Sequence, residues 1–368
     1  MTQNNNKHRT VSLRPARSIA VTSGKGGVGK STLSLNLALE LSRRGKRVCL
    51  FDADTNLANI TIMTGLVPEK TLGDWLTGQA GLQDILLEGP QGLHIVPAAS
   101  GLLELVDLDP VQQQRLIDLL QRLERDYDFL VVDTAAGADR QVLSFLQAVG
   151  EVLLVITPEP TSLTDAFSLL KLLHREGYRR PVQVVVNRTP DFDKARATLI
   201  RFATAVRKYI GLRVVAPGYV YDDPLASVAV NRQKPLLELF PESRAGQCLR
   251  NFTRSLMQRD SDPTRSLSAW LAEQGGARIP LQRLIEDPDA DWVDEVVERI
   301  RNEPLEDVRL WMQLFSSAWQ KRLAEEAARS GPETRREGFL AAVRFASRLG
   351  RDPRRLALVS NGSEDAAG

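Results

Sequence analysis

The sequence has few cysteines and no long apolar run, and both absences narrow the kinds of protein that it can encode. Its 368 residues include only two cysteines, Cys49 and Cys248, which are far apart in the chain. This spacing argues against a disulfide framework and against a cysteine-based metal site. No segment reaches the roughly 18 continuous apolar residues that a membrane span needs. Residues 1–10 also lack the apolar core of a secretory signal. We therefore expect a globular cytoplasmic protein.

The chain has little excess charge of either sign. From Asp260 onward, 16 basic residues stand against 20 acidic ones, which leaves 32 against 26 for the preceding part. The two parts therefore have net charges of −4 and +6. Neither part is basic enough to indicate nucleic-acid binding by itself. Residues 1–17 carry positive charges only, and we expect them to form a flexible basic tail.

Short runs rich in Val, Ile and Leu alternate with helix-like segments between Ser18 and Arg259. Runs of this kind suit strands that are buried on both faces of a parallel sheet. Helical patterns, such as those of 111–123 and 163–173, lie between them. We therefore expect an α/β fold over 18–259, with a doubly wound, mostly parallel sheet that binds ligands at the carboxyl ends of its strands. The predicted strands are 18–22, 47–53, 93–98, 129–134, 152–157, 182–187 and 212–217.

The character of the chain changes after Arg259. No convincing strand follows, and apolar residues recur at helical spacing. We expect a small all-α domain over 264–356 and a disordered tail over 357–368. Since tryptophan is common at binding hot spots, this helical module is expected to bind a protein partner, and packing within its own core is the plainer alternative. Four of the five tryptophans fall in this region: Trp270, Trp292, Trp311 and Trp319.

One segment of this helical region, 335–351, has an apolar side and a charged, mainly basic side. A helix of this kind can pack against the preceding helix or lie on the surface of an anionic membrane. Its apolar side is thin, because alanines make up much of it. We favour packing, and weak membrane association that depends on dimerisation is the alternative.

The strongest chemical signal is the glycine-rich segment 24–31, which follows a predicted strand and precedes a predicted helix. In that context the pattern GxxxxGK[ST] forms a phosphate-binding loop (P-loop). Its backbone amides approach phosphate oxygens closely, and the helix N-terminus favours anions. We expect Lys30 to bridge the β- and γ-phosphates of ATP and the hydroxyl of Ser31 to bind Mg²⁺. The expected nucleotide-binding residues of the loop are Gly24, Gly26, Gly27, Val28, Gly29, Lys30, Ser31 and Thr32.

Three carboxylates stand at the ends of predicted strands, where the fold brings them near the phosphates. Asp52 and Asp54 stand at the end of the second strand, and Asp133 stands at the end of the fourth. We expect Asp52 and Asp133 to orient the Mg²⁺ shell and Asp54 to position the attacking water. Any one of them could instead be a strand-end cap, but three together beside a P-loop favour the catalytic interpretation.

These motifs resemble those of the MinD/ParA-type deviant Walker A ATPases. The resemblance covers roughly 18–258 and rests on segment 23–59, while 131–148 and 151–173 more narrowly resemble the FlhG/FleN branch, which controls flagellar number and placement. It implies that Lys25 reaches the phosphates of a second subunit in an ATP-bound homodimer, so that Lys25, Lys30 and Asp54 are the catalytic set. It further implies that Glu159 reaches the ribose in the second subunit, that Asn187 reads adenine, and that Asp165 lies on the partner-binding face of the dimer.

The expected function is therefore an ATP-dependent dimerisation switch with slow ATPase activity. It regulates the position or number of a cell-surface organelle, flagellar by the resemblance, from the cytoplasm, the inner face of the cell membrane or a cell pole. The alternative is a ParA-like partition or polar-positioning ATPase that binds DNA or a polar scaffold. The +6 charge of the first part supports DNA binding only modestly. Iron–sulfur carriers of this fold would need clustered cysteines, which the chain lacks.

Overall fold

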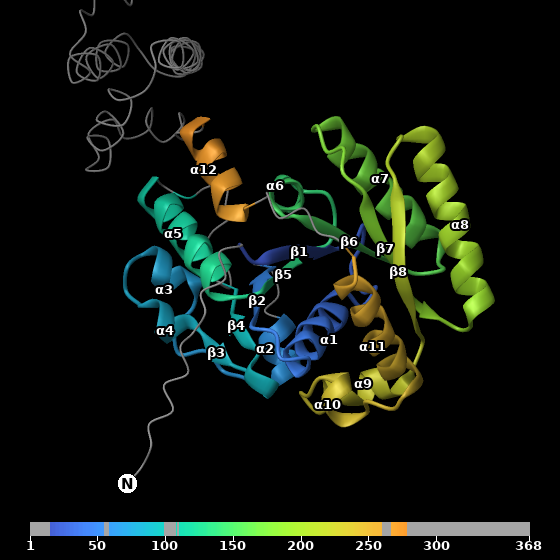
Figure 1. The fold of residues 1–368 in the computed structure, drawn as a ribbon, viewed down its shortest axis with the longest axis horizontal. Helices are drawn as coiled ribbons and strands as arrows, with labels where there is room; N and C mark the ends of the chain where they lie inside the picture. Colours follow the sequence, from blue (N-terminus) through green and yellow to red (C-terminus); the bar gives the residue numbers. More distant parts are fainter. Residues whose placement is uncertain (1–14, 55–58, 99–107, 109, 260–265, 278–368) are drawn as a thin grey trace, which may run out of the picture. The chain divides into compact units, whose positions relative to one another are not determined.

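The computed structural model describes residues 15–54, 59–98, 108, 110–259 and 266–277 (Figure 1). Most of the expected helical module therefore lies outside the described residues, as do segment 335–351, the tail 357–368 and three of the four late tryptophans. The chain divides into two compact units, one formed by 1–108 with 112–273 and the other by 109–111 with 274–368. The sheet and the site described below belong to the first unit.

An eight-stranded sheet forms the centre of the first unit, in the order β3-β4-β2-β5-β1-β6-β7-β8. All neighbouring strands are parallel except β3 and β4, which confirms the expected doubly wound, mostly parallel sheet. Each of the seven predicted strands is present, whereas the two-residue β3 is too short to leave a sequence signal. The strands are β1 (Arg17–Thr22), β2 (Val48–Ala53), β3 (Leu87–Glu88), β4 (His94–Val96), β5 (Phe129–Thr134), β6 (Glu151–Ile156), β7 (Val182–Thr189) and β8 (Val214–Tyr221).

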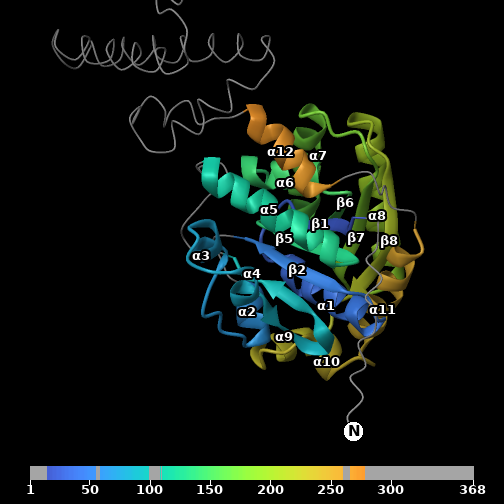
Figure 2. The same ribbon diagram turned by 60° about the vertical axis from the view of Figure 1, so that its left-hand side comes forward.

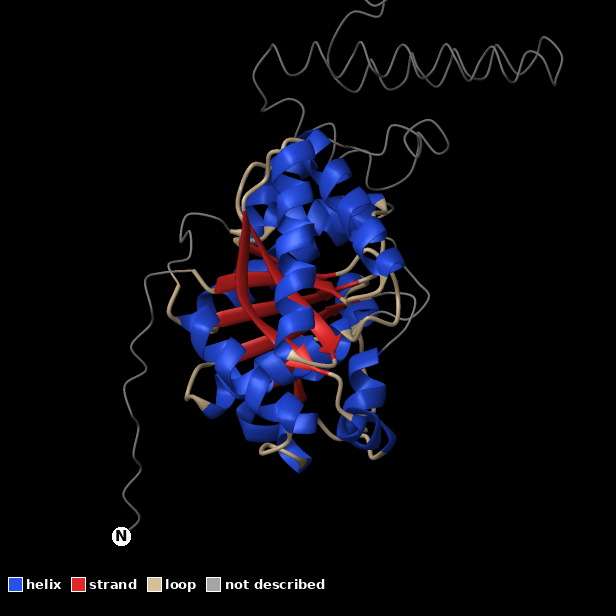
Figure 3. Ribbon diagram, turned by 90° about the vertical axis from the view of Figure 1, so that its right-hand side faces the viewer, coloured by secondary structure: helices blue, strands red, loops and turns tan. Residues whose placement is uncertain are grey.

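Helices cover both faces of this sheet and make three layers (Figures 2 and 3). One face packs against α1 (Lys30–Arg43), α2 (Asn59–Thr64), α9 (Pro224–Asn231), α10 (Leu236–Leu239) and α11 (Arg244–Met257). The other packs against α3 (Leu72–Leu76), α4 (Leu82–Ile85), α5 (Pro110–Asp126), α6 (Arg140–Ala148), α7 (Pro160–Arg175), α8 (Phe192–Tyr209) and the start of α12 (Leu267–Ala277). A 3-10 turn, η1 (Pro90–Gly92), precedes β4.

The central strands are apolar on both sides because two cores need them. Along β5, Leu130 and Val132 enter the core below α5 and α6, and Phe129 and Val131 enter the core below α1. Alternate side chains of a strand point to opposite faces, so a strand between two helical layers has no polar side. Among the described residues, no helix is long and apolar enough to cross a membrane.

The start of β1 corrects the boundary of the basic tail. Arg17, which was expected to belong to the tail, is the first residue of β1 and is largely buried. Its guanidinium pairs with Glu151 at the start of β6 and donates to the backbone carbonyl of Leu256, 2.9 Å away. Both partners are far away in the sequence, so the local run of basic residues could not reveal them.

The first turn of α12 also belongs to the first unit. Leu267 is fully buried in the core, and the buried carboxylate of Glu124 on α5 receives three hydrogen bonds from this turn. The donors are the Ser266 hydroxyl at 2.7 Å, the Leu267 amide at 2.5 Å and the Ser268 hydroxyl at 2.6 Å. The carboxylate thus caps the N-terminus of α12. The division between the two units consequently falls after Glu273, beyond the expected boundary at 259–264.

Candidate nucleotide-binding site

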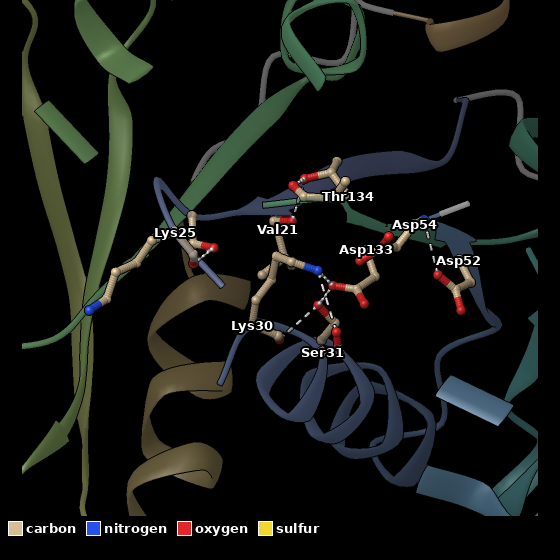
Figure 4. Close-up of polar contacts among 11 residues, drawn as sticks. Val21, Lys25, Lys30, Ser31, Asp52, Asp54, Asp133 and Thr134 are labelled. Atoms are coloured by element: carbon tan, nitrogen blue, oxygen red, sulfur yellow. Dashed lines mark hydrogen bonds and ion pairs between the residues drawn. The ribbon is translucent and has the colours of Figure 1, made fainter. Parts of the chain in front are cut away.

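The phosphate-binding loop lies between the end of β1 and the start of α1 (Figure 4). Gly27 and Gly29 have φ angles of 78° and 89°, which side chains rarely adopt, and α1 begins at Lys30. Gly24 is required for another reason: a Cβ there would lie 2.2 Å from the backbone carbon of Asp165 in α7. The loop is therefore packed directly against α7, and Asp165 is brought beside it.

The side chain of Lys30 points toward Asp133 at the end of β5. Its ammonium lies 3.0 Å from Oδ1 of Asp133 and 3.4 Å from the hydroxyl of Ser31. The hydroxyl of Ser34 also donates to this Asp133 oxygen, at 2.8 Å. Lys30 and Asp133 are both buried, so each compensates the charge of the other. A nucleotide that binds Lys30 has to replace this contact.

Asp52 and Asp133 face each other across β2 and β5, where they are register partners. Oδ1 of Asp52 accepts a hydrogen bond from the Asp54 amide at 3.1 Å, and Asp54 is buried beside it. Burial, and then the neighbouring Asp133 carboxylate, raise the pKa of Asp52 to about 8. The ionised form of Asp52 is therefore disfavoured in the metal-free site, and a bound cation would reverse this effect.

Two oxygens of this pair are suited to hold Mg²⁺. Oδ2 of Asp52 and Oδ2 of Asp133 are buried, and neither has a hydrogen-bond partner among the described residues. The Ser31 hydroxyl lies near these carboxylates, because it is 3.4 Å from the Lys30 ammonium that contacts Asp133 (Figure 4). The described residues hold no group of three acidic, His or Cys side chains that could bind a metal alone. Mg²⁺ keeps phosphate oxygens and waters as ligands and needs only one or two carboxylates, which the Asp52–Asp133 pair provides.

Lys25 leaves the loop in the other direction. Figure 4 shows its side chain pointing away from Lys30 and Asp133. Its ammonium lies 2.7 Å from the carboxylate of Glu159, which precedes α7, and 2.9 Å from the hydroxyl of Thr161. The hydrogen bond from Lys25 lowers the pKa of Glu159. The pair is exposed, so solvent screens it.

Asn187, near the end of β7, contacts the loop itself. Its side-chain amide donates to the carbonyl of Val28 at 2.8 Å and is mostly buried. Gly26 and Thr32 complete the loop and the first turn of α1, and a Cβ at Gly26 would meet nothing within 4 Å. The structure thus places close together all of the residues that were predicted for the site from the sequence. They are Gly24 to Thr32, Asp52, Asp54 and Asp133, with Glu159 and Asn187 against the loop.

Two polar residues of this site were not predicted from the sequence. Ser34 lies one turn after Lys30 in α1, and its hydroxyl contacts both the Lys30 carbonyl and Asp133. Its position four residues after Lys30 could have suggested that it faces the same strand ends. Thr161 contacts Lys25 from α7, and no local pattern of the sequence predicts this contact.

The comparisons with known proteins agree with this geometry. The model of a family described as an AAA domain matches residues 16–177. The antiactivator FleN of Pseudomonas aeruginosa is 42% identical over 234 residues, which cover 64% of this chain and 84% of FleN. The flagellum site-determining protein YlxH of Helicobacter pylori is 32% identical over 269 residues, with 72% and 86% covered. The septum site-determining protein MinD of Pyrococcus horikoshii, solved with Mg-ADP, superposes with a TM-score of 0.54 at 25% identity, covering 66% of this chain and 96% of MinD.

The chain belongs to the MinD/ParA family of P-loop ATPases. FleN and YlxH are among its relatives, so the resemblance to the FlhG/FleN branch is confirmed. Residues 16–177 of this MinD/ParA-type chain, which the family model matches, include the P-loop and strands β1 to β6. The match to FleN covers 64% of the chain. The family supports nucleotide binding in general, and the Asp52–Asp133 pair fits the accompanying Mg²⁺.

Proposed function

We propose that the chain is an ATP-dependent dimerisation switch with slow ATPase activity, which regulates the number or placement of flagella. The observation that supports it most is the direction of Lys25. This lysine belongs to the P-loop, yet its ammonium turns away from the site that Lys30 serves. A lysine so placed can serve the phosphates of a second copy. The similarity to YlxH, a flagellum site-determining protein, supplies the flagellar part of the proposal.

Dimer formation releases Lys25 from Glu159 and Thr161. Both contacts are on the surface of the described unit, and exposed ion pairs contribute little to stability, so the release is easy. In the dimer, Lys25 donates to the phosphates in the second copy, and the freed Glu159 reaches the ribose there. Because this contact exists only when ATP is bound and the dimer is closed, the nucleotide controls the association.

Hydrolysis uses groups that are already at the ends of β2 and β5. Lys30 moves from Asp133 to the β- and γ-phosphates, and Asp54 orients the attacking water. Ser31, Asp52 and Asp133 would hold Mg²⁺, which would neutralise charge on the phosphates. Lys25 adds a second positive charge from the other copy. Asn187, which now contacts Val28, reads the adenine ring from the same side of the loop.

A protein partner binds the dimer on the face that includes Asp165, and the residues after Ala277 provide a second binding region in this proposal. Truncation after Ala277 keeps the capped turn of α12, whereas truncation after Arg259 would leave Glu124 buried without its donors. We therefore expect the 1–277 fragment to dimerise with ATP like the full chain. Loss of ATP-dependent dimerisation in that fragment would refute the independence of the C-terminal residues.

The flagellar role is tested in the native host. Deletion of the gene is expected to change the number or position of flagella counted by electron microscopy. The wild-type gene should restore the count, and the Lys25→Ala variant should not. An unchanged count, combined with ATP-dependent retention of DNA by the purified protein, would favour the partition alternative instead.

A further inference from the structure

An extra residue interrupts the end of β7, beside the phosphate-binding loop. In its pairing with β8, Val186 lies opposite Tyr219, but Thr189 lies opposite Tyr221. Between these two pairs the chain advances by three residues on β7 but by only two on β8. This difference is the signature of a β-bulge. Within this bulge Arg188 has a φ of 53°. Arginine rarely adopts the left-handed backbone, and such residues gather at functional sites.

The bulge changes where two consecutive side chains point. In a regular strand, Asn187 and Arg188 would face opposite sides of the sheet. Here a Cβ built on Gly29 would lie 2.4 Å from Nδ2 of Asn187 and 3.9 Å from Nε of Arg188. Both side chains therefore lie against the same glycine of the P-loop. A regular strand cannot place both of them there, so the bulge and the left-handed residue are what bring Arg188 to the loop.

The guanidinium of Arg188 makes no direct contact that fixes it in this position. Its side chain is exposed. After Lys25, its positive charge also helps to lower the pKa of Glu159, but no hydrogen bond or ion pair joins the two side chains among the described residues. Gly29 is the N-cap of α1, where the helix dipole favours an anion, and Lys30 follows immediately. A guanidinium beside a helix N-terminus and a lysine is stabilised by a bound anion, and planar guanidinium groups suit phosphate oxygens.

We propose that Arg188 is a nucleotide-binding residue, which donates from its guanidinium to a phosphate oxygen of the nucleotide held by the P-loop. The inference rests on the proposed binding of ATP and adds a residue that the P-loop motif does not include. The strained backbone of Arg188 is maintained because it places the guanidinium over Gly29. A residue that served the fold alone would be better replaced by glycine.

Two substitutions of Arg188 distinguish a role in binding from a role in the fold. Glycine tolerates the left-handed backbone, so Arg188→Gly should relieve strain while removing the guanidinium. Arg188→Gln keeps the backbone strain and most of the side-chain length but removes the charge. Gln91 has a φ of 59° and lies in η1, on a different part of the chain. Gln91→Gly is therefore the matched control, because it changes a left-handed residue to glycine outside the proposed site.

The test measures ATP binding and thermal unfolding of the full-length chain. We expect Arg188→Gln and Arg188→Gly to weaken binding of a fluorescent ATP analogue about ten- to a hundredfold, as the loss of a charge-assisted hydrogen bond does. The Tm of nucleotide-free Arg188→Gly should not fall, and Gln91→Gly should bind ATP like the wild type. Competition by GTP should weaken by the same factor, because the contact is to phosphate.

Three results for the Arg188 variants would overturn the proposal. ATP affinity of Arg188→Gln within twofold of wild type would exclude a contact with the nucleotide. A lower Tm of Arg188→Gly would assign Arg188 to the fold. A loss of ATP affinity without a matching loss for GTP would place the contact on the base. Failure of the wild-type chain to bind ATP would refute the proposed function together with this inference.

Discussion

The contact between Gly24 and α7 makes one substitution especially informative. A methyl group at Gly24 would lie 2.2 Å from the backbone carbon and 2.6 Å from the carbonyl oxygen of Asp165, and 2.3 Å from the amide nitrogen of Ala166. Carbon atoms in ordinary contact are about 3.5–4.0 Å apart. The loop and α7 would have to separate by about 1.5 Å, and no flexible side chain is there to yield. Overpacking usually costs about 1–3 kcal/mol, and a clash with backbone belongs at the upper end of that range.

We therefore expect Gly24→Ala to lower the free energy of unfolding by about 3 kcal/mol. For a domain of this size that corresponds to a fall in Tm of about 5–10 °C. The control is Gly26→Ala in the same loop, where the added Cβ meets nothing within 4 Å. Differential scanning calorimetry of the nucleotide-free proteins measures both. If Gly24→Ala and Gly26→Ala unfold at the same temperature, the tight contact between the loop and α7 is refuted.

Three further predictions concern the carboxylates. Asp54→Ala should slow ATP turnover by about 10² to 10⁴ and retain the ATP-bound dimer, as loss of a water-positioning group does; turnover within twofold of wild type would assign that role elsewhere. Because the pKa of Asp52 is raised to about 8, the protonated carboxyl contributes stability to the metal-free fold. This contribution is complete below about pH 4 and is lost as the pH rises to about 8. Urea unfolding should therefore show a stability that declines over this window by up to about 1.4 kcal/mol per pH unit relative to Asp52→Asn, and parallel profiles would contradict the raised pKa. Glu124→Ala removes the acceptor of three hydrogen bonds from the start of α12, so amide exchange over 267–273 should accelerate at least about tenfold. If amides 267–273 exchange equally fast in Glu124→Ala and in an Asp118→Ala control, the cap does not stabilise this turn.

The sequence predicts the part of the site that follows from topology. Parallel strands end at one edge of the sheet, so Asp52 and Asp133 had to lie near the loop that follows β1. The P-loop motif carries its own backbone geometry through its glycines. The strand runs were equally clear because burial on both faces leaves them no polar side.

What the sequence does not predict depends on partners that are distant in the chain. Neither the burial of Arg17 against Glu151 nor the cap that Glu124 provides for α12 has a local pattern. The bulge that turns Arg188 toward Gly29 contains no glycine, so it leaves no turn signal in the sequence. These features are set by packing between elements, which a single sequence does not display.

The central claim is that ATP closes a dimer through Lys25, and the oligomeric state tests it most directly. Sedimentation velocity of the full-length chain should show a monomer with ADP and a dimer with Mg-ATP. Lys25→Ala should bind ATP with near wild-type affinity, because Lys25 does not contact its own P-loop site, and it should remain a monomer. Dimerisation of Lys25→Ala at the ATP concentration that dimerises the wild type would contradict the account.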